Sequence, residues 1–497
     1  MAAKITNPKI GAELVEELQD EAAYQNCKAF SATHSFLRKV LYFAHDQEYA
    51  RIPAKQIKEW FETYGINYKV CLDVLVSHKL LEIDRHYIKG IKSRGYKLTE
   101  KGAKLMCAGQ MHYLKKLFAD RDLQRKLQKQ QSYHRTKGTD YREPILQYIH
   151  DGLMGYTFDE AAVNHIEKSN WGYLTRLKAM MSLTDFAERD FVKLKYNDAD
   201  TRCWNEFAGM KSELRRYFSL GDLHYQYVID IRSCHPLFLA HYLLKRSQPM
   251  GKPMHPITPF DPADKNFAKN FPSVKLQRER SERLTNTPST TINPQPTTTL
   301  ISSNSTTSSS TTNSILHYDG GISDIEVELK RWNELFSDPD TDPKTVLIRD
   351  LGYTREQSKA ALNQTINGGK RYGRFIKWFK KHYPRLFAVW NRTDKAKVGV
   401  GISTWYETVL MQDMGLYALA GTLGLHLTYE FDGCGVMCRN DDKEILAKIQ
   451  QLIAFIQAVS EHRWGIRPVV VVKTAMGETV DMSNQCRSAE RISRGSC

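Results

Sequence analysis

The chain has 497 residues, a length that allows roughly three domains, and its hydrophobic content of 41% is enough for sizeable cores. Lysine and arginine number 71 against 56 aspartates and glutamates, a formal net charge of +15, which favours a polyanionic partner such as nucleic acid. A basic membrane-surface protein is the weaker alternative. No apolar run approaches the ~20 residues of a membrane span, and the N-terminus lacks the apolar core of a signal peptide.

The nine cysteines are scattered along the chain without a Cys-x-x-Cys pair. This usage is typical of reduced thiols in a cytoplasmic compartment and argues against a zinc module. Cys434 and Cys438 are close in sequence, but no histidine or second cysteine pair accompanies them, so we interpret them as core thiols.

The first hundred residues predict a compact unit that begins with helices. An acidic amphipathic pattern comes first, and three segments with apolar residues at helical spacing follow it. The four predicted helices cover residues 11–26, 35–44, 53–64 and 67–79.

Two short strands follow these helices, at residues 80–84 and 95–99, and a basic loop with Lys89, Lys92 and Arg94 joins them. Three helices and a basic hairpin resemble a winged helix-turn-helix, in which the third helix enters a major groove and the wing contacts phosphates. A winged helix that binds protein instead of DNA is the alternative.

Residues 100–131 predict a long basic helix, and residues 143–181 predict a mainly helical region. The basic face of the first helix is either solvated or follows the backbone of a nucleic-acid duplex.

The residues around Asp230 predict a buried strand that ends at this aspartate. Residues 227–229 are apolar and mostly β-branched or aromatic, and a helical pattern begins at Pro236. An aspartate at the end of a buried strand is poorly solvated, and a bound cation is the usual compensation. A turn or helix N-cap aspartate is the alternative reading of this position.

Residues 250–316 interrupt the folded pattern. A proline-rich segment comes first, and a Ser/Thr/Asn/Pro tract follows over residues 285–314. The tract has almost no apolar residues, so we expect a disordered insertion within one folded unit. A helical pattern resumes at Ser323.

A helix is predicted over residues 354–370, and Arg355 and Lys359 project from one of its faces because they are four residues apart. Two cations one turn apart can clamp a triphosphate. Asn363 continues the same row, and Asn367 with the following glycines ends the helix. An exposed basic helix face is the alternative.

A second strand, around residues 428–432, carries Asp432 with a glycine beside it for a tight turn. Two strand-borne aspartates far apart in sequence are what a two-metal phosphoryl-transfer site requires. A last strand is predicted over residues 467–473, and the tail from Met482 is polar.

Taken in order, these motifs resemble the family A DNA polymerases, including the related single-subunit RNA polymerases, over residues 200–480. The resemblance implies that Asp230 and Asp432 hold two Mg²⁺ ions and that Arg355 and Lys359 bind the triphosphate, Lys359 also acting in catalysis. It further implies nucleic-acid contacts near the primer terminus, made by Arg202 and by Arg215 or Arg216.

The sequence departs from the family at four positions. Asn363 stands where the family has an aromatic that stacks on the nucleotide, and Asn367 replaces a tyrosine. Phe431 replaces a histidine, and His235 replaces the glutamate that discriminates the sugar, so the preference for deoxy- or ribonucleotides stays open. The first motif, Asp-Ile-x-x-x-x-Pro, is similar to that of some phage and mobile-element replication proteins.

We therefore expect an α+β protein with an N-terminal winged helix and a right-hand polymerase core whose palm is an antiparallel sheet. The expected units, in chain order, are a winged helix at 1–104, a helical thumb-like region at 105–195, a first palm part at 196–265, the insertion at 266–318, fingers at 319–400, a second palm part at 401–480 and a tail at 481–497.

The expected activity is template-directed nucleotidyl transfer, with primer-template, nucleoside triphosphates and possible replication proteins as partners. The expected setting is the cytoplasm of a bacterial or phage-infected cell, without a membrane. The rival hypothesis is a non-catalytic DNA-binding replication initiator or regulator in which the winged helix acts and the polymerase core is degenerate.

Overall fold

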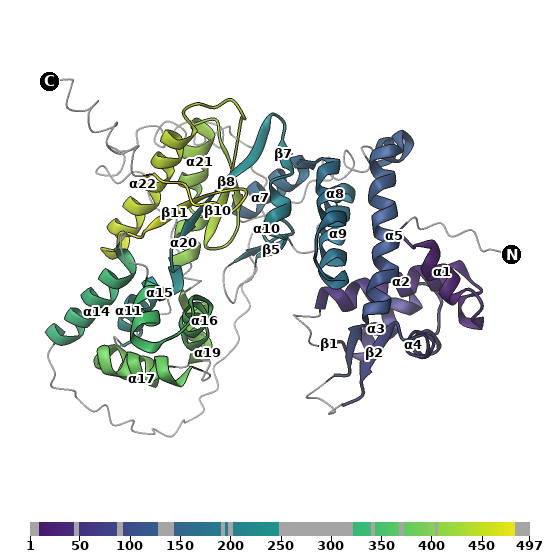
Figure 1. Ribbon diagram of the computed structural model, residues 1–497, viewed down its shortest axis with the longest axis horizontal. Helices are drawn as coiled ribbons and strands as arrows, with labels where there is room; N and C mark the ends of the chain where they lie inside the picture. Colours follow the sequence, from purple (N-terminus) through teal and green to yellow (C-terminus); the bar gives the residue numbers. More distant parts are fainter. Residues whose placement is uncertain are drawn as a thin grey trace, which may run out of the picture.

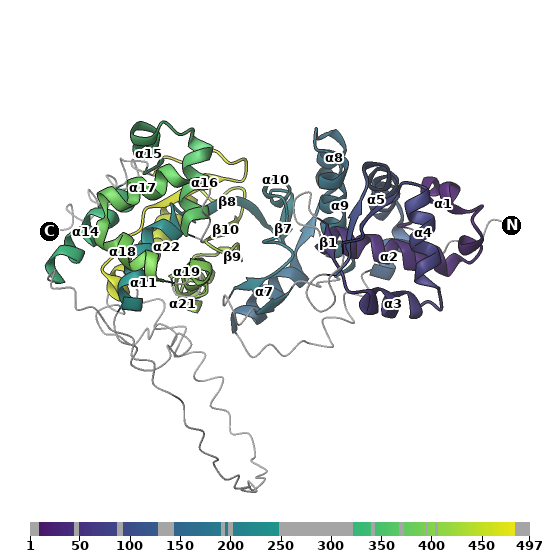
Figure 2. The same ribbon diagram turned by 90° about the horizontal axis from the view of Figure 1, so that it is seen from below.

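The protein is a mixed α+β chain in which a helical N-terminal unit and a larger C-terminal unit lie at opposite ends of an elongated molecule (Figures 1 and 2). The computed structural model describes residues 9–43, 49–86, 93–127, 144–189, 194–196, 202–247, 322–338, 343–366, 372–393, 395–402 and 406–482.

The N-terminal unit packs helices on a small antiparallel sheet with strand order β1-β3-β2. Phe36, Phe61 and Tyr96 form its buried aromatic centre. The helix expected over 11–26 is a short helix and a separate 3₁₀ turn. The elements are α1 (Ala12–Leu18), η1 (Ala22–Tyr24), α2 (Cys27–Phe43), β1 (Ala50–Arg51), α3 (Ala54–Glu62), α4 (Tyr68–Ser77), β2 (Leu81–Asp84) and β3 (Gly95–Leu98).

Helix α5 (Glu100–Ala119) connects this unit to the rest of the chain and packs against α1 and α9. Thr99 caps it by accepting a hydrogen bond from the Gly102 amide at 3.0 Å. The helix ends at Asp120, whose backbone is extended, and residues 121–127 are helical again. The helical stretch expected over 100–131 is therefore confirmed for its described residues, with a break at Asp120, and residues 128–131 lie outside the described ranges. The expected unit boundary at 104/105 falls inside α5. Three further helices follow: α7 (Pro144–Gly155), α8 (Glu160–Lys168) and α9 (Tyr173–Glu188).

An antiparallel sheet lies at the centre of the C-terminal unit, with strand order β4-β7-β8-β10-β9 and with β11 also paired to β8. β8 is the central strand, because β10 follows its whole length on one side while β7 and β11 share the other side. The strands are β4 (Thr157–Phe158), β7 (Phe218–Leu220), β8 (Leu223–Ile231), β9 (His426–Tyr429), β10 (Gly433–Cys438) and β11 (Val470–Thr474).

β4 lies within the expected helical region 105–195, yet it pairs with β7 at the edge of this sheet. A separate two-stranded ribbon and the short helix α10 lie between β4 and β7 in the chain, and helix α21 packs on β9 and on α22, which also contacts α20. These elements are β5 (Lys195–Tyr196), β6 (Cys203–Trp204), α10 (Ser212–Arg215), α20 (Thr408–Met411), α21 (Met414–Thr422) and α22 (Ile445–Trp464).

A helical cluster stands at the C-terminal end of β8 and packs around α11 (Figure 1). Trp332 is buried there, and its indole donates to the Pro236 carbonyl at 2.6 Å. The buried Glu328 carboxylate accepts the Arg385 and Leu386 amides at the start of α18. The helices are α11 (Cys234–Ser247), α14 (Ile322–Ser337), α15 (Pro343–Leu351), α16 (Arg355–Ile366), α17 (Gly373–His382), α18 (Pro384–Arg392) and α19 (Lys395–Ile402).

None of the helices in the described ranges combines the length and apolar composition that crossing a membrane requires. Several expectations lie outside the described residues: the insertion at 266–318, Lys89 and Lys92 of the wing, Asn367, and the tail beyond Met482.

Candidate active site

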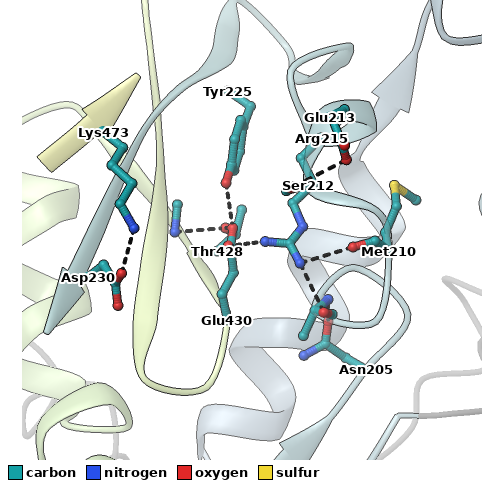
Figure 3. A network of polar contacts seen from close by, with 12 residues as sticks. Asn205, Met210, Ser212, Glu213, Arg215, Tyr225, Asp230, Thr428, Glu430 and Lys473 are labelled. Carbon is teal, nitrogen blue, oxygen red and sulfur yellow. Dashed lines mark hydrogen bonds and ion pairs between the residues drawn. The ribbon is translucent and has the colours of Figure 1, made fainter. Parts of the chain in front are cut away.

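Asp230 lies at the C-terminal end of the central strand, as the sequence predicts. Its backbone is opposite Gly433 of β10 on one side and Val471 of β11 on the other. The Lys473 ammonium donates to the Asp230 carboxylate at 2.8 Å (Figure 3). Lys473 is opposite Val228, so the ion pair joins diagonal neighbours on one face of the sheet.

Asp432 lies beside this strand end, but in a turn and not on a strand, so that part of the prediction is wrong. The Glu430 amide donates to the Gly433 carbonyl at 3.1 Å, which makes Phe431 and Asp432 the two turn residues between β9 and β10. Phe431 has φ 69°, a strained value for a residue other than glycine. The Ile231 amide donates to the Asp432 carbonyl at 3.3 Å and fixes the turn against the end of β8.

The Asp432 carboxyl is exposed by area yet closely surrounded by protein on its other sides. Burial, together with the negative charges of Asp230 and Glu407, raises its pKa to about 6. A carboxylate exposed on one side in this way can be reached by a ligand. A cation placed there would relieve the repulsion.

Glu407 is a third carboxylate at this position, and its side chain is fully buried. Arg202 holds it with a fork of two hydrogen bonds, at 2.9 and 2.7 Å, and His235 Nε2 lies 3.1 Å from the same carboxylate. Burial works to raise the pKa of Glu407, but the hydrogen bonds from His235 and Arg202 hold it below its usual value.

The thiol of Cys234, the first residue of α11, is buried. Burial raises the pKa of this thiol far above its usual range, and the charges of Glu407, Asp432 and Asp230 raise it further. The thiol therefore stays protonated and inert.

Arg202 and His235, which the sequence predicts as site residues, both lie here through their contacts with Glu407. Arg202 also stacks over the Phe431 ring, with its guanidinium carbon 5.1 Å from the ring centroid. The Trp204 ring also packs against the Phe431 ring, with 5.1 Å between the two ring centroids. Phe431, which the family resemblance places where a histidine is expected, therefore connects the turn to the segment that contains Arg202 and Trp204.

Arg215 has a structural role in this conformation. Its guanidinium pairs with Glu430 and donates to the carbonyls of Ala208 and Met210 at 2.9 and 3.1 Å (Figure 3). Only 12% of its side chain is exposed. Arg215 is thus held inside the protein and supports the turn that contains Asp432. Whether it also contacts nucleic acid stays a prediction.

Glu430 is the centre of this network, since Tyr225 and Thr428 also donate to its carboxylate, at 2.8 and 2.9 Å (Figure 3). Arg216, the other arginine that the sequence predicts as a nucleic-acid contact, takes no part in the Glu430 network. It donates to the Tyr217 hydroxyl at 2.7 Å, and its guanidinium lies over the Tyr217 ring.

Arg355, Lys359 and Asn363 form one exposed row along α16, while Ser358 and Leu362 face the core. Helix α16 packs against α11, which begins four residues after Asp230, and it lies beside the end of β8 in both views (Figures 1 and 2). The helix ends at Ile366.

In the N-terminal hairpin, Arg94 is exposed at the start of β3, and its carbonyl accepts the Ile52 amide at 3.3 Å. The side chain is therefore open to a ligand, as the prediction of a basic wing requires.

Sequence reasoning missed three residues of the site: Glu407, Glu430 and Lys473. Glu407 stands alone in an apolar run, and such a carboxylate needs a buried partner. Lys473 directly follows a run of four valines on a strand, which also indicates a cation with a specific neighbour. The pairing of each could be learned only from the fold.

Within the described residues, no group of three or more His, Cys, Asp and Glu side chains is arranged to hold a metal ion. Asp230 and Asp432 supply carboxylate oxygens of the kind that Mg²⁺ prefers, and the crowding of Asp432 by other acids fits a cation site. Glu407 is engaged by Arg202 and His235 instead.

The sequence matches no known protein-family model, and no curated protein is significantly similar to it.

Proposed function

We propose that this chain is a template-directed nucleotidyltransferase whose active centre is formed by Asp230 and Asp432. The observation that carries the proposal is the meeting of these two aspartates at one end of an antiparallel sheet, although 201 residues separate them in sequence. Asp432 is open on one side and its pKa is raised to about 6, by burial first and then by the charges of Asp230 and Glu407, as in sites built for a cation.

The exposed row on α16 supports the same proposal. Arg355 and Lys359 lie on the exposed face of a helix that packs on α11, the helix that follows β8. In this function they bind the β- and γ-phosphates of the incoming nucleotide and balance the charge that develops on the departing pyrophosphate.

Two Mg²⁺ ions held by Asp230 and Asp432 would lower the pKa of a primer 3′-hydroxyl and neutralise phosphate charge. Arg202 contributes a cation on the same side, held by Glu407 and stacked on Phe431. The chain's own residues thus position the reacting groups and supply fixed positive charge around them.

The order of elements in the N-terminal unit supports the proposal that it is a winged helix. Helix α2, strand β1, helices α3 and α4 and the hairpin of β2 and β3 follow one another, with the three strands in one sheet. Such a unit would present α4 and the hairpin to duplex DNA.

The rival function, a non-catalytic DNA-binding initiator, is favoured by one observation. Lys473 pairs with Asp230, so one of the two expected metal ligands already has a cation beside it. If the polymerase core were degenerate, this ion pair would be a purely structural contact.

Primer extension on a labelled primer-template with Mg²⁺ and either deoxy- or ribonucleotides separates the two functions. We expect incorporation by the wild-type chain and a loss of at least about 10³-fold in Asp230→Asn and Asp432→Asn, with Asp222→Asn unaffected. Asp222 is the exposed acid at the other end of β8, paired with Arg439. Absence of incorporation by a folded wild-type chain that binds duplex DNA would support the initiator.

A further inference from the structure

A groove of about 1010 Å³ separates the N-terminal unit from the C-terminal unit. One wall is strand β3 with the start of α5, the second is α9, and the third is the segment that leads into α10. Of the residues described for the candidate active site, Met210 and Arg215 also line the groove.

Each wall of the groove carries one lysine: Lys97 on β3, Lys178 on α9 and Lys211 before α10. Within the described residues, no acidic side chain pairs with Lys97 or Lys211. Both lie instead over aromatic rings, Lys97 6.0 Å from the Tyr49 centroid and Lys211 5.0 Å from the Trp171 centroid. Their charges therefore stay available to an anion in the groove.

Two glutamates also line the groove and reduce its positive charge. Glu82 lies opposite Lys97 in the β2–β3 pair and accepts a hydrogen bond from the Tyr49 hydroxyl at 3.1 Å. Glu100 is the first residue of α5, where the helix dipole stabilises its carboxylate. Three lysines against these two carboxylates leave a small positive excess, and the Thr175 hydroxyl on the α9 wall can donate to a phosphate oxygen.

The inner end of the groove is Arg215, whose guanidinium pairs with Glu430. Glu430 directly precedes the turn with Asp432, so this ion pair connects the groove lining to the turn of the candidate active site.

We propose that this groove binds single-stranded nucleic acid and guides the unpaired template strand from the N-terminal unit to the active site. The lysines contact its phosphates. The guiding role depends on the proposed nucleotidyltransferase function, whereas strand binding by the groove does not.

The test uses the full chain and a fluorescein-labelled single-stranded DNA oligonucleotide, without metal or nucleotide. The triple variant Lys97→Gln, Lys178→Gln, Lys211→Gln should bind at least about tenfold more weakly at low salt. The slope of log K against log salt should fall by about 2, the value for three lost phosphate contacts on a single strand.

The matched control neutralises three exposed lysines outside the groove, Lys330, Lys381 and Lys443, so that net charge falls equally. We expect less than about a twofold change in its affinity, since such lysines contribute only through the long-range field. Equal weakening of both triple variants, or an unchanged groove variant, would overturn the proposal. So would lysine-dependent binding of polyglutamate in place of DNA, because the groove would then fit an acidic protein.

Primer extension on the same variants separates this proposal from the proposed function. If the wild-type chain incorporates no nucleotides but the groove variant loses strand binding, the groove proposal is supported and the polymerase proposal is wrong. If the wild-type chain incorporates nucleotides but the groove variant binds the strand normally, the groove proposal is wrong and the polymerase proposal is supported.

Discussion

At the scale of single residues, the two candidate metal ligands differ in electrostatic environment. Asp230 has the Lys473 ammonium at 2.8 Å, whereas the nearest charges of Asp432 include two other acids. A protein optimised for stability alone would avoid the second arrangement, because repulsion between carboxylates costs free energy in the folded state. Such a cost is common where a site must bind a cation.

Asp432→Asn should therefore stabilise the protein while removing activity. The folded-state pKa of about 6, raised by burial first and then by Asp230 and Glu407, lies above the unfolded value, so the charged carboxyl destabilises the fold above that pH. We expect Tm to rise by about 2–4 °C at neutral pH. This corresponds to a gain of ~1 kcal/mol in the free energy of unfolding, a value that already allows for solvent screening of the exposed carboxyl. The gain should vanish at low pH, where both states bind the proton.

Thermal unfolding of Asp432→Asn and of the control Asp222→Asn, each in metal-free buffer over a range of pH, tests this expectation. A Tm lower than that of the wild type would mean that Asp432 is a stabilising structural residue, which would weaken the proposed site.

Glu407 makes the opposite contribution, since its buried charge is balanced by Arg202 and His235. Glu407→Gln leaves the Arg202 guanidinium without its anion and should cost about 2–4 kcal/mol in the free energy of unfolding. In the double variant with Arg202→Gln the two costs should not add, because both mutations remove the same pair. Urea titrations of the two single variants and the double variant measure this coupling, and additive costs would show that the pair is not a unit.

Among these residues, Asp230 could be predicted from its position between an apolar strand and a helix. The same reasoning predicts Asp432 as a site residue but places it on a strand, whereas it lies in a turn. The turn could not be predicted, because an apolar sequence does not reveal the positive φ of Phe431. The partners Glu407 and Lys473 could not be predicted, since each lies far along the chain from the residue that it contacts.

At the scale of single elements, α16 shows how far periodicity alone is informative. The spacing of Arg355 and Lys359 predicts a shared face, and both are indeed exposed on one face of a helix. Only the packing of α16 on α11 relates that face to the end of β8.

Lys359→Ala should lower the single-turnover rate of nucleotide incorporation by about 10²-fold, because the lost charge acts mainly on the developing pyrophosphate. Affinity for primer-template should hardly change. Gln364→Ala is the matched control, since Gln364 is exposed on another face of the same helix. Wild-type incorporation rates in Lys359→Ala would exclude the assignment, and a loss of duplex affinity alone would make α16 a nucleic-acid contact.

In the N-terminal unit, His78 at the end of α4 joins three elements through Glu17 and Glu21. Its ring nitrogens lie 2.7 and 2.9 Å from the two carboxylates, and their hydrogen bonds, that of Glu21 foremost, raise the pKa of His78 above its usual value. The folded state thus binds a proton more tightly than the unfolded state. This stabilisation is complete below the unfolded pKa and is lost as the pH rises through the folded one.

His78→Gln should therefore destabilise the chain by about 0.5–1 kcal/mol near pH 5.5, and by much less near pH 8.5, because the pair is partly exposed. Urea unfolding at both pH values measures the difference. Equal destabilisation at the two values would mean that the ring packs without carrying charge.

At the scale of the whole molecule, the sequence predicts an α+β chain with helices, a small hairpin unit and an antiparallel sheet in the right order. The placement of β4 at the sheet edge and of β11 beside β8 could not be predicted, because strand pairing over such separations depends on the packing of the complete fold. The groove between the two units could not be predicted for the same reason, because its three lysines come from segments that lie far apart in the sequence.

The same long-range packing bears on residues 285–314, which the sequence assigns to an insertion. The flanking helices α11 and α14 pack directly on each other, and the Trp332 indole donates to the Pro236 carbonyl across their contact. The two halves of the fold are therefore joined by this contact between the two helices. A shorter connection also reduces the entropy cost of closing the loop, by about 0.6 kcal/mol for each halving of its length.

Deletion of residues 285–314 should therefore leave Tm unchanged or slightly raised, and nucleotide incorporation should stay within about twofold of the wild type, because loop length affects stability only weakly. Thermal unfolding and primer extension on the deletion variant measure both. The matched control is Trp332→Phe in the full-length chain, which removes the indole donor from the α11–α14 contact and should lower Tm. If the deletion lowered Tm as much as this control does, the segment would be part of the core that joins the two helices.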